Sequence, residues 1–250
     1  MGVAQLVTPR VWTGRSSGRW FYMGMAAFAF AFSIAAFGPS LVNTAGRKGP
    51  TTALVAAHGV VYFAWLAIFL AQTVLVRTKR VGLHRRLGTA SAFLALAVVI
   101  LGYLTAVGYA RRGFDMSGDL GAFGAPWRQL PFMLLDLLMF TILVSAGYAF
   151  RRHAAIHKRL MLLAVVGALM PASITHLTGH YPLLRGFPLM TLAVLVLFLA
   201  SSAIYDFCAF RRIHPVSLWV ALAIFAADNL CARVIAPSAA WQSVFTWIAK

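Results

Sequence analysis

The sequence predicts an all-α integral membrane protein, a polytopic bundle of about seven transmembrane helices. Of its 250 residues, 61% are hydrophobic and only 11% are charged, and the mean hydropathy is +0.82. Soluble domains are about 45–50% apolar and about 25% charged, so a soluble fold of this length could not cover so much apolar surface. Apolar runs of membrane-spanning length also recur along the chain, separated by short Gly-, Pro- and Arg-containing segments.

Each of these runs is close to the roughly 20 residues that a helix needs to cross the hydrocarbon core. We expect the spans at 20–42, 52–76, 87–110, 130–150, 159–178, 187–210 and 215–236. Pro171 falls within the fifth span and should kink it, because proline lacks the amide donor of a regular helix.

The domain prediction is a single transmembrane domain over 1–250. It divides into a cytoplasmic basic tail at 1–19, the seven-helix bundle at 20–236 and a carboxyl-terminal tail at 237–250. In that last tail Ser238 can cap a short helix. Its apolar residues recur at i, i+3, i+4 and i+7, at Trp241, Val244, Phe245 and Ile248. This stripe predicts an amphipathic helix that either lies in the membrane interface or packs on the bundle.

Lys and Arg residues set the expected orientation. With the amino end inside, 14 basic residues fall on the inner side and 8 on the outer side. The inner set is Arg10, Arg15, Arg19, Arg77, Lys79, Arg80, Arg85, Arg86, Arg151, Arg152, Lys158, Arg159, Arg211 and Arg212. Basic residues favour the cytoplasmic loops, so we expect the amino end inside and the carboxyl end outside.

The net charge of +17 does not indicate a nucleic-acid partner. The basic residues lie in short clusters between apolar runs, where they meet lipid headgroups and set topology. The expected partners are the lipid bilayer and other membrane subunits, with no nucleic acid. The two cysteines, Cys208 and Cys231, form no Cys-x-x-Cys pair, which excludes a cysteine-based zinc or iron–sulfur site.

Seven polar residues from four spans are expected to share the outer leaflet. They are His58, Asp136, His176, His180, Asp228, Asn229 and Arg233. Ionisable groups inside a bilayer are costly, about 2.5–3.5 kcal/mol each on insertion scales, so each needs a partner or a function. Two interpretations stay open: the residues pair with one another, for example Asp136 with Arg233, or they form a water-accessible ligand or proton site.

The inner side carries further polar residues. His84, His153, His157 and His214 each lie beside Arg or Lys, which suggests headgroup contact. Asp206, near the inner end of the sixth span, is expected to pair with Arg211, with Arg212 or with the basic loop 77–86.

Three short motifs resemble a large family of uncharacterised bacterial seven-helix membrane proteins. They are Leu83-His84-Arg85-Arg86-Leu87-Gly88, His157-Lys158-Arg159-Leu160-Met161 and His214-Pro215-Val216. The resemblance implies the fold and a location in the bacterial cytoplasmic (inner) membrane, but no activity. In the fifth helix, where that family often has an acidic residue and an Arg, this chain has Met170-Pro171-Ala172-Ser173 followed by His176.

Three functional hypotheses follow, and whether the protein is an enzyme stays open. A non-enzymatic subunit or small-ligand binder accommodates every observation. A haem b-binding redox subunit would use His58 with His176 or His180 as axial ligands. A zinc-dependent intramembrane hydrolase would use these three histidines as ligands, with Asp136 or Asp228 as general base.

Overall fold

The computed structural model describes residues 16–43, 47–118, 124–185 and 188–250, and within these ranges the chain is helical, with no strand. The first four helices are α1 (Ser16–Val42), α2 (Ala53–Arg77), α3 (Val81–Arg112) and α4 (Pro126–Ala149). The remaining elements are α5 (Ala154–Ala168), α6 (Met170–His180), α7 (Pro182–Arg185), α8 (Pro188–Phe210), α9 (Pro215–Leu230), a π-helical turn η2 (Cys231–Ile235) and α10 (Ala239–Ile248).

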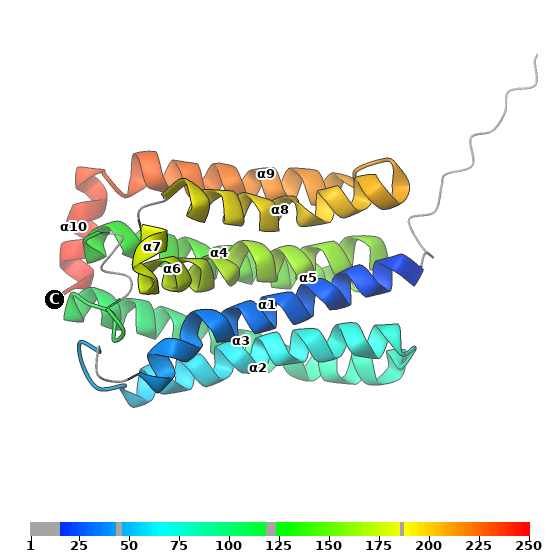
Figure 1. Cartoon of the computed structure of the whole chain (residues 1–250), viewed down its shortest axis with the longest axis horizontal. Helices are drawn as coiled ribbons and strands as arrows, with labels where there is room; N and C mark the ends of the chain where they lie inside the picture. The colour runs from blue at the N-terminus through cyan, green and yellow to red at the C-terminus, as the bar shows by residue number, and fades with distance from the viewer. Residues whose placement is uncertain (1–15, 44–46, 119–123, 186–187) are drawn as a thin grey trace, which may run out of the picture.

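Seven of the described segments are long and apolar enough to cross a membrane, which confirms the predicted fold class. Four of them are single helices in the first half of the chain, and the fifth is the pair α5–α6. The last two are Thr191–Phe210 within α8 and α9 continued through η2. Successive segments run in opposite directions along the bundle (Figure 1).

The two ends of the bundle carry different features. The amino-terminal end, as we name it, is where α1 begins, and the carboxyl-terminal end is where α10 lies across the bundle (Figure 1). At the amino-terminal end α2 and α3 are joined by a turn of only three residues, 78–80. The predicted basic loop 77–86 was therefore wrong in extent. Arg85 and Arg86 belong to the first turns of α3. Their long side chains can reach the membrane interface from a helix end, so the helix can include them.

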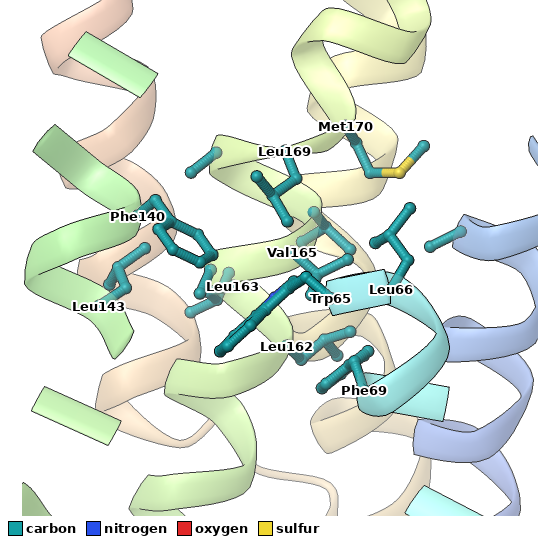
Figure 2. Packing of buried hydrophobic residues seen from close by; sticks show 14 of the residues in the cluster. Trp65, Leu66, Phe69, Phe140, Leu143, Leu162, Leu163, Val165, Leu169 and Met170 are labelled. Atoms are coloured by element: carbon teal, nitrogen blue, oxygen red, sulfur yellow. The ribbon is translucent and has the colours of Figure 1, made fainter. Parts of the chain in front are cut away.

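The helix pair α5–α6 lies at the centre of the bundle. Its most apolar window is 67% buried, against 11–33% for the other spans. Trp65, Leu66 and Phe69 of α2 pack towards α5, as does Phe140 of α4 (Figure 2). The rings of Trp65 and Phe140 meet edge to face with centroids 5.1 Å apart. The other spans therefore form a shell around α5–α6 and expose their outer faces, as lipid-facing helices do.

A glycine allows close approach in this core. A Cβ atom on Gly167 of α5 would lie 2.7 Å from Cδ1 of Ile224 and 3.1 Å from Cδ2 of Leu199. Small residues let membrane helices approach one another closely, and here Gly167 does so for α8 and α9 together.

The predicted carboxyl-terminal helix is confirmed as α10, capped as expected by Ser238, whose hydroxyl accepts a hydrogen bond from the Trp241 amide. Its apolar residues Trp241, Phe245 and Ile248 pack on a small second core made by Ala106, Ala110 and Leu130. The Trp241 indole Nε1 also donates to the Trp127 carbonyl at 2.6 Å. The structure therefore shows that α10 packs on the bundle, while its position in the membrane interface stays a prediction.

Two arginines at the carboxyl-terminal end cap helices. Arg47 donates to the carbonyls of Ser40 and Leu41 in the last turn of α1, at 2.7–3.0 Å. Arg111 donates through Nε to the Ile248 carbonyl in the last turn of α10. Cations at helix carboxyl ends satisfy carbonyls that have no intrahelical partner and complement the helix dipole. Some basic residues on this side of the bundle therefore have a structural role.

Candidate functional site

The central helix is interrupted near Pro171, as predicted. Helix α5 ends at Ala168, Leu169 is a turn residue, and α6 begins at Met170. Beside the interruption, the Tyr62 hydroxyl of α2 donates to the Leu169 carbonyl at 3.1 Å. Interrupted helices are tolerated in membranes where a neighbouring helix satisfies the freed backbone groups, and Tyr62 supplies such a bond.

Three hydroxyl groups meet at this interruption. The Ser173 hydroxyl lies 2.8 Å from the Tyr62 hydroxyl and 2.9 Å from that of Ser33, and the last two are 3.2 Å apart. Ser33 and Ser173 have no exposed surface, and Tyr62 is 6% exposed. We call these three residues the hydroxyl triad. It joins α1, α2 and α6 in the carboxyl-terminal half of the bundle.

Two histidines lie on the side of the triad that faces the carboxyl-terminal end. His58 precedes Tyr62 by one helical turn, and its ring centroid is 6.4 Å from the Tyr62 ring. His176 lies in α6, and its ring packs on Phe37 at 4.5 Å. The two imidazoles are close enough to interact electrostatically. Nδ1 of His58 is buried and has no hydrogen-bond partner within the described part of the chain.

Two carboxylates form the other part of the site. Asp136 of α4 and Asp228 of α9 interact electrostatically with each other, and Asp136 also acts on Tyr62. Both act on the thiol of Cys231, which is 1% exposed. Oδ2 of Asp228 is buried and finds no hydrogen-bond partner among the residues described.

A backbone irregularity adjoins this acidic pair. The π-helical turn η2 starts at Cys231, three residues after Asp228. Single π turns within helices are frequent at functional sites, because they widen the backbone and redirect side chains. The acidic pair and the histidines therefore lie beside two separate helix irregularities, η2 and the α5–α6 interruption.

We name the hydroxyl triad, the two histidines and the two carboxylates together the carboxyl-terminal polar group. Four of the seven predicted site residues belong to it: His58, Asp136, His176 and Asp228. Their depths differ more than expected. With a rise of about 1.5 Å per residue, His58 lies about 8 Å along α2 from its start and Asp136 about 15 Å along α4. Asp136 is deeper because α4 begins at Pro126 rather than at residue 130.

The other three predicted residues lie apart from the group. The Asn229 amide donates to the Phe225 carbonyl of its own helix at 2.8 Å. Arg233 is exposed and forms no ion pair with Asp136, so that suggested pairing was wrong. Arg233 lies on η2, whose buried residue is Cys231. The ring of His180 contacts that of Tyr181, at the end of α6.

The described residues contain no group of three or more His, Cys, Asp or Glu side chains that could hold a metal ion. His58, His176 and His180 therefore do not form a three-histidine site in this structure. The geometry gives no support to the zinc hydrolase hypothesis. For the haem hypothesis, the structure provides an electrostatic interaction between His58 and His176.

A second polar cluster, at the amino-terminal end, was not predicted as a site. Arg159 and Asp206 have no exposed surface and form a two-pronged ion pair, Nη2 with Oδ1 and Nε with Oδ2, the latter at 3.0 Å. The expected pairing of Asp206 with Arg211, Arg212 or residues 77–86 was therefore wrong. Arg159 points into the bundle from α5, while Arg211 and Arg212 are exposed beyond the end of α8.

Neighbouring groups complete the hydrogen bonding of this pair. Ser217 donates to Asp206 Oδ2 at 2.6 Å and lies 2.9 Å from the Ser202 hydroxyl. The backbone N–H of His214 donates to the same carboxylate oxygen, and Arg159 Nη1 donates to the Ala155 carbonyl. The cluster ties α5, α8 and α9 together, and we name it the Arg159–Asp206 network.

His214 also caps a helix. Its Nδ1 accepts a hydrogen bond from the Val216 amide at 3.2 Å, at the start of α9. Burial lowers the pKa of His214, as does the positive charge of Arg159, while Asp206 opposes the shift. A neutral ring is required for this cap, because a protonated Nδ1 can only donate. Only 8% of His214 is exposed, so its role is to cap α9 rather than to contact lipid headgroups.

The two clusters differ in how completely their polar atoms are bonded. In the Arg159–Asp206 network both carboxylate oxygens of Asp206 accept hydrogen bonds. In the carboxyl-terminal polar group, His58 Nδ1 and Asp228 Oδ2 are buried without a partner. Buried polar atoms in native structures are nearly always bonded, so those that are not call for an explanation such as an unseen ligand or ion.

Comparison with protein-family models, with curated proteins and with solved structures found no match for this chain.

Proposed function

We propose that the protein is a non-enzymatic multi-pass membrane protein that binds a small cation at the carboxyl-terminal polar group. The observation that carries this proposal is the pair of carboxylates, Asp136 and Asp228, which interact electrostatically inside the membrane-spanning region; neither of them forms an ion pair with a described residue. Two like charges in a region of low dielectric repel each other, and a bound cation or proton relieves both the repulsion and the desolvation.

The chemistry of the surrounding groups favours a small, hard cation. Carboxylate, hydroxyl and carbonyl oxygens are the ligands that such ions prefer. Asp136, Asp228 and the Tyr62 hydroxyl supply oxygen atoms in this region, and Asp228 Oδ2 has an unused lone pair. The adjacent helix irregularities support the same proposal, because interrupted membrane helices often border ion and substrate sites.

The direct test measures the thermal stability of the detergent-purified chain in sodium, potassium, ammonium and choline chloride at equal ionic strength. A ligand that binds only the folded state stabilises it by about 2.7 kcal/mol at one hundred times its dissociation constant. We expect at least one of the three small cations to raise the melting temperature above that in choline. The increase should be lost in Asp136→Asn and Asp228→Asn.

Arg233→Gln is the matched control, because Arg233 lies one to two turns from Asp228 but is exposed. It should keep the cation response. Identical melting of the unaltered chain in all four salts would contradict the proposal, and so would an equal response in the two Asp variants.

A second candidate, a haem b-binding subunit, is supported by the electrostatic interaction of His58 on α2 with His176 on α6. Two histidines from facing helices are the usual ligands of a b-type haem in a helical bundle. The protein purified from haem-supplemented cells should then show a Soret band that is lost in His58→Gln and His176→Gln. A purified sample without this band eliminates the candidate.

The orientation and location form part of the proposal. The 14-to-8 distribution of basic residues supports an amino end in the cytoplasm. The capping roles of Arg47 and Arg111 account for two of the eight basic residues assigned to the outer side. The polar group then lies towards the outer leaflet. The bacterial cytoplasmic membrane is the proposed location on the sequence resemblance alone, with lipid and other membrane subunits as candidate partners.

A further inference from the structure

Two histidines from different helices meet at the amino-terminal end, away from both clusters described above. His84 lies in the first turn of α3 and His157 in the first turn of α5. Their ring centroids are 6.2 Å apart, with the ring planes at 81°. His153, four residues before His157, is exposed at the start of α5 and takes no part in this contact.

The ring nitrogens of the two imidazoles have different surroundings. Nδ1 of His157 lies 2.8 Å from the Gly147 carbonyl oxygen. A carbonyl only accepts, so this nitrogen carries the proton and Nε2 keeps its lone pair. Nδ1 of His84 is buried and has no hydrogen-bond partner in the described chain. This nitrogen is therefore available to a ligand.

The bond of His157 to the Gly147 carbonyl is of the kind that metal-binding histidines make. A ligating imidazole usually donates its other N–H to a carbonyl or carboxylate, which fixes the tautomer and orients the ring. The rings are 6.2 Å apart between centroids. A metal ion bound by one nitrogen of each ring, with metal–nitrogen bonds of about 2.0 Å, would hold the two centroids at a similar distance.

A thioether lies on the same helix face. Met161 follows His157 by one turn of α5, and its sulfur would lie 2.6 Å from a Cβ placed on Gly147. Gly147 is also the residue whose carbonyl orients His157. The imidazole of His157 and the sulfur of Met161 therefore border the same short stretch of α4.

The charges around this pair select the kind of ion. Asp115, Asp136, Asp206 and Asp228, the described acidic residues, all lie elsewhere: in the 113–118 loop, in the carboxyl-terminal polar group or paired with Arg159. The nearby charge that acts on His84 is the cation Arg85. Without carboxylates, the site suits neither Ca²⁺ nor Mg²⁺, whereas imidazole and thioether ligands suit Cu(I), a soft ion with a single positive charge.

We propose that His84 and His157, with Met161 as a third ligand, form a Cu(I) site at the amino-terminal end of the bundle. This site uses other residues than the proposed cation site, and the two proposals are tested independently.

The test measures Cu(I) bound per chain in the detergent-purified full-length protein. The sample is kept anaerobic and reduced, and a chromogenic Cu(I) chelator competes for the ion. We expect the unaltered chain to hold one more equivalent than His84→Gln or His157→Gln. Met161→Leu should retain the site with a dissociation constant raised about tenfold or more, since two ligands remain.

His153→Gln is the matched control and should bind as much copper as the unaltered chain, because His153 is an exposed histidine four residues from His157. Thermal melting of each variant shows whether it is folded. If a histidine variant does not fold, Met161→Leu, which conserves the side-chain volume, still tests the site. Equal copper in all folded variants would overturn the proposal, as would uptake of Zn(II) in preference to Cu(I). A lowered melting temperature with unchanged copper would show that the two histidines only join helices.

Discussion

Breaking the Arg159–Asp206 network should cost more stability than any other single polar change in the bundle. The perturbation is Asp206→Asn, which keeps the size of the side chain but removes its charge. Asp206 accepts hydrogen bonds from Arg159 Nε and Nη2, the Ser217 hydroxyl and the His214 amide. An amide keeps one acceptor oxygen and places an NH₂ donor against these groups, so the Arg159 charge stays buried without a counter-ion.

The magnitude follows from complete burial of both partners, each with 0% of its side chain exposed. Removing one partner of a buried ion pair costs about 3–5 kcal/mol, because an uncompensated charge remains. Replacing both partners with apolar residues, as in Arg159→Met with Asp206→Leu, should be near neutral or stabilising by about 1–4 kcal/mol, because neither charge is then desolvated.

The assay is reversible unfolding in mixed micelles of increasing denaturing-detergent content, followed by tryptophan fluorescence. The single variant should lose about 3–5 kcal/mol of unfolding free energy and the double variant should recover most of it. A loss of less than about 1 kcal/mol in the single variant would refute the reasoning, because the pair would then behave as an exposed one.

Three further predictions use the same unfolding measurement. The pKa of His214 is lower in the folded chain than in the unfolded chain, so the unfolded chain binds the proton at a higher pH. The stability that the neutral ring contributes is therefore complete above about pH 6.5. It is lost as the pH falls through the pKa of the folded state. His214→Gln should flatten this pH dependence, and an unchanged slope would contradict the cap. Gly167→Ala should cost about 1–3 kcal/mol, because the added methyl overlaps Ile224; a neutral result would mean that the helices separate freely. Trp241→Ala should cost about 2 kcal/mol through lost packing and the lost bond to Trp127, with faster proteolysis of α10; unchanged proteolysis would show that α10 does not depend on this contact.

Span number was predictable from the sequence because the bilayer imposes one requirement, a long apolar run, on every crossing helix. The helix ends were not, because hydropathy drops where cationic side chains begin, whereas the helix backbone continues. Helix α3 thus starts at Val81, six residues before the predicted span, and includes Arg85 and Arg86. Likewise α5 begins at Ala154 rather than at residue 159.

The candidate site was predictable in part. His58, Asp136, His176 and Asp228 were found because an ionisable side chain within an apolar run is conspicuous. Asn229 could not be excluded beforehand, since its bond to the Phe225 carbonyl depends on the rotamer rather than on the residue type.

Arg159 was counted among the inner basic residues because it directly follows His157 and Lys158, a basic run at the start of an apolar span. Its signal was the isolated carboxylate of Asp206 near the end of an apolar span, which must find a cation. Which cation it finds depends on how α5 and α8 are packed, and that arrangement is a property of the three-dimensional fold.

The difference between Asp228, whose Oδ2 has no described partner, and the fully bonded Asp206 is the central claim. One comparison tests it: the unfolding free energies of Asp228→Asn and Asp206→Asn in choline chloride, without a small cation. Asp228→Asn should leave stability unchanged or raise it, since Asp228 Oδ2 has no hydrogen-bond partner to lose, while Asp206→Asn should lose about 3–5 kcal/mol. Equal losses in both variants would show that Asp228 is bonded in the fold as Asp206 is, and would remove the basis for a cation site.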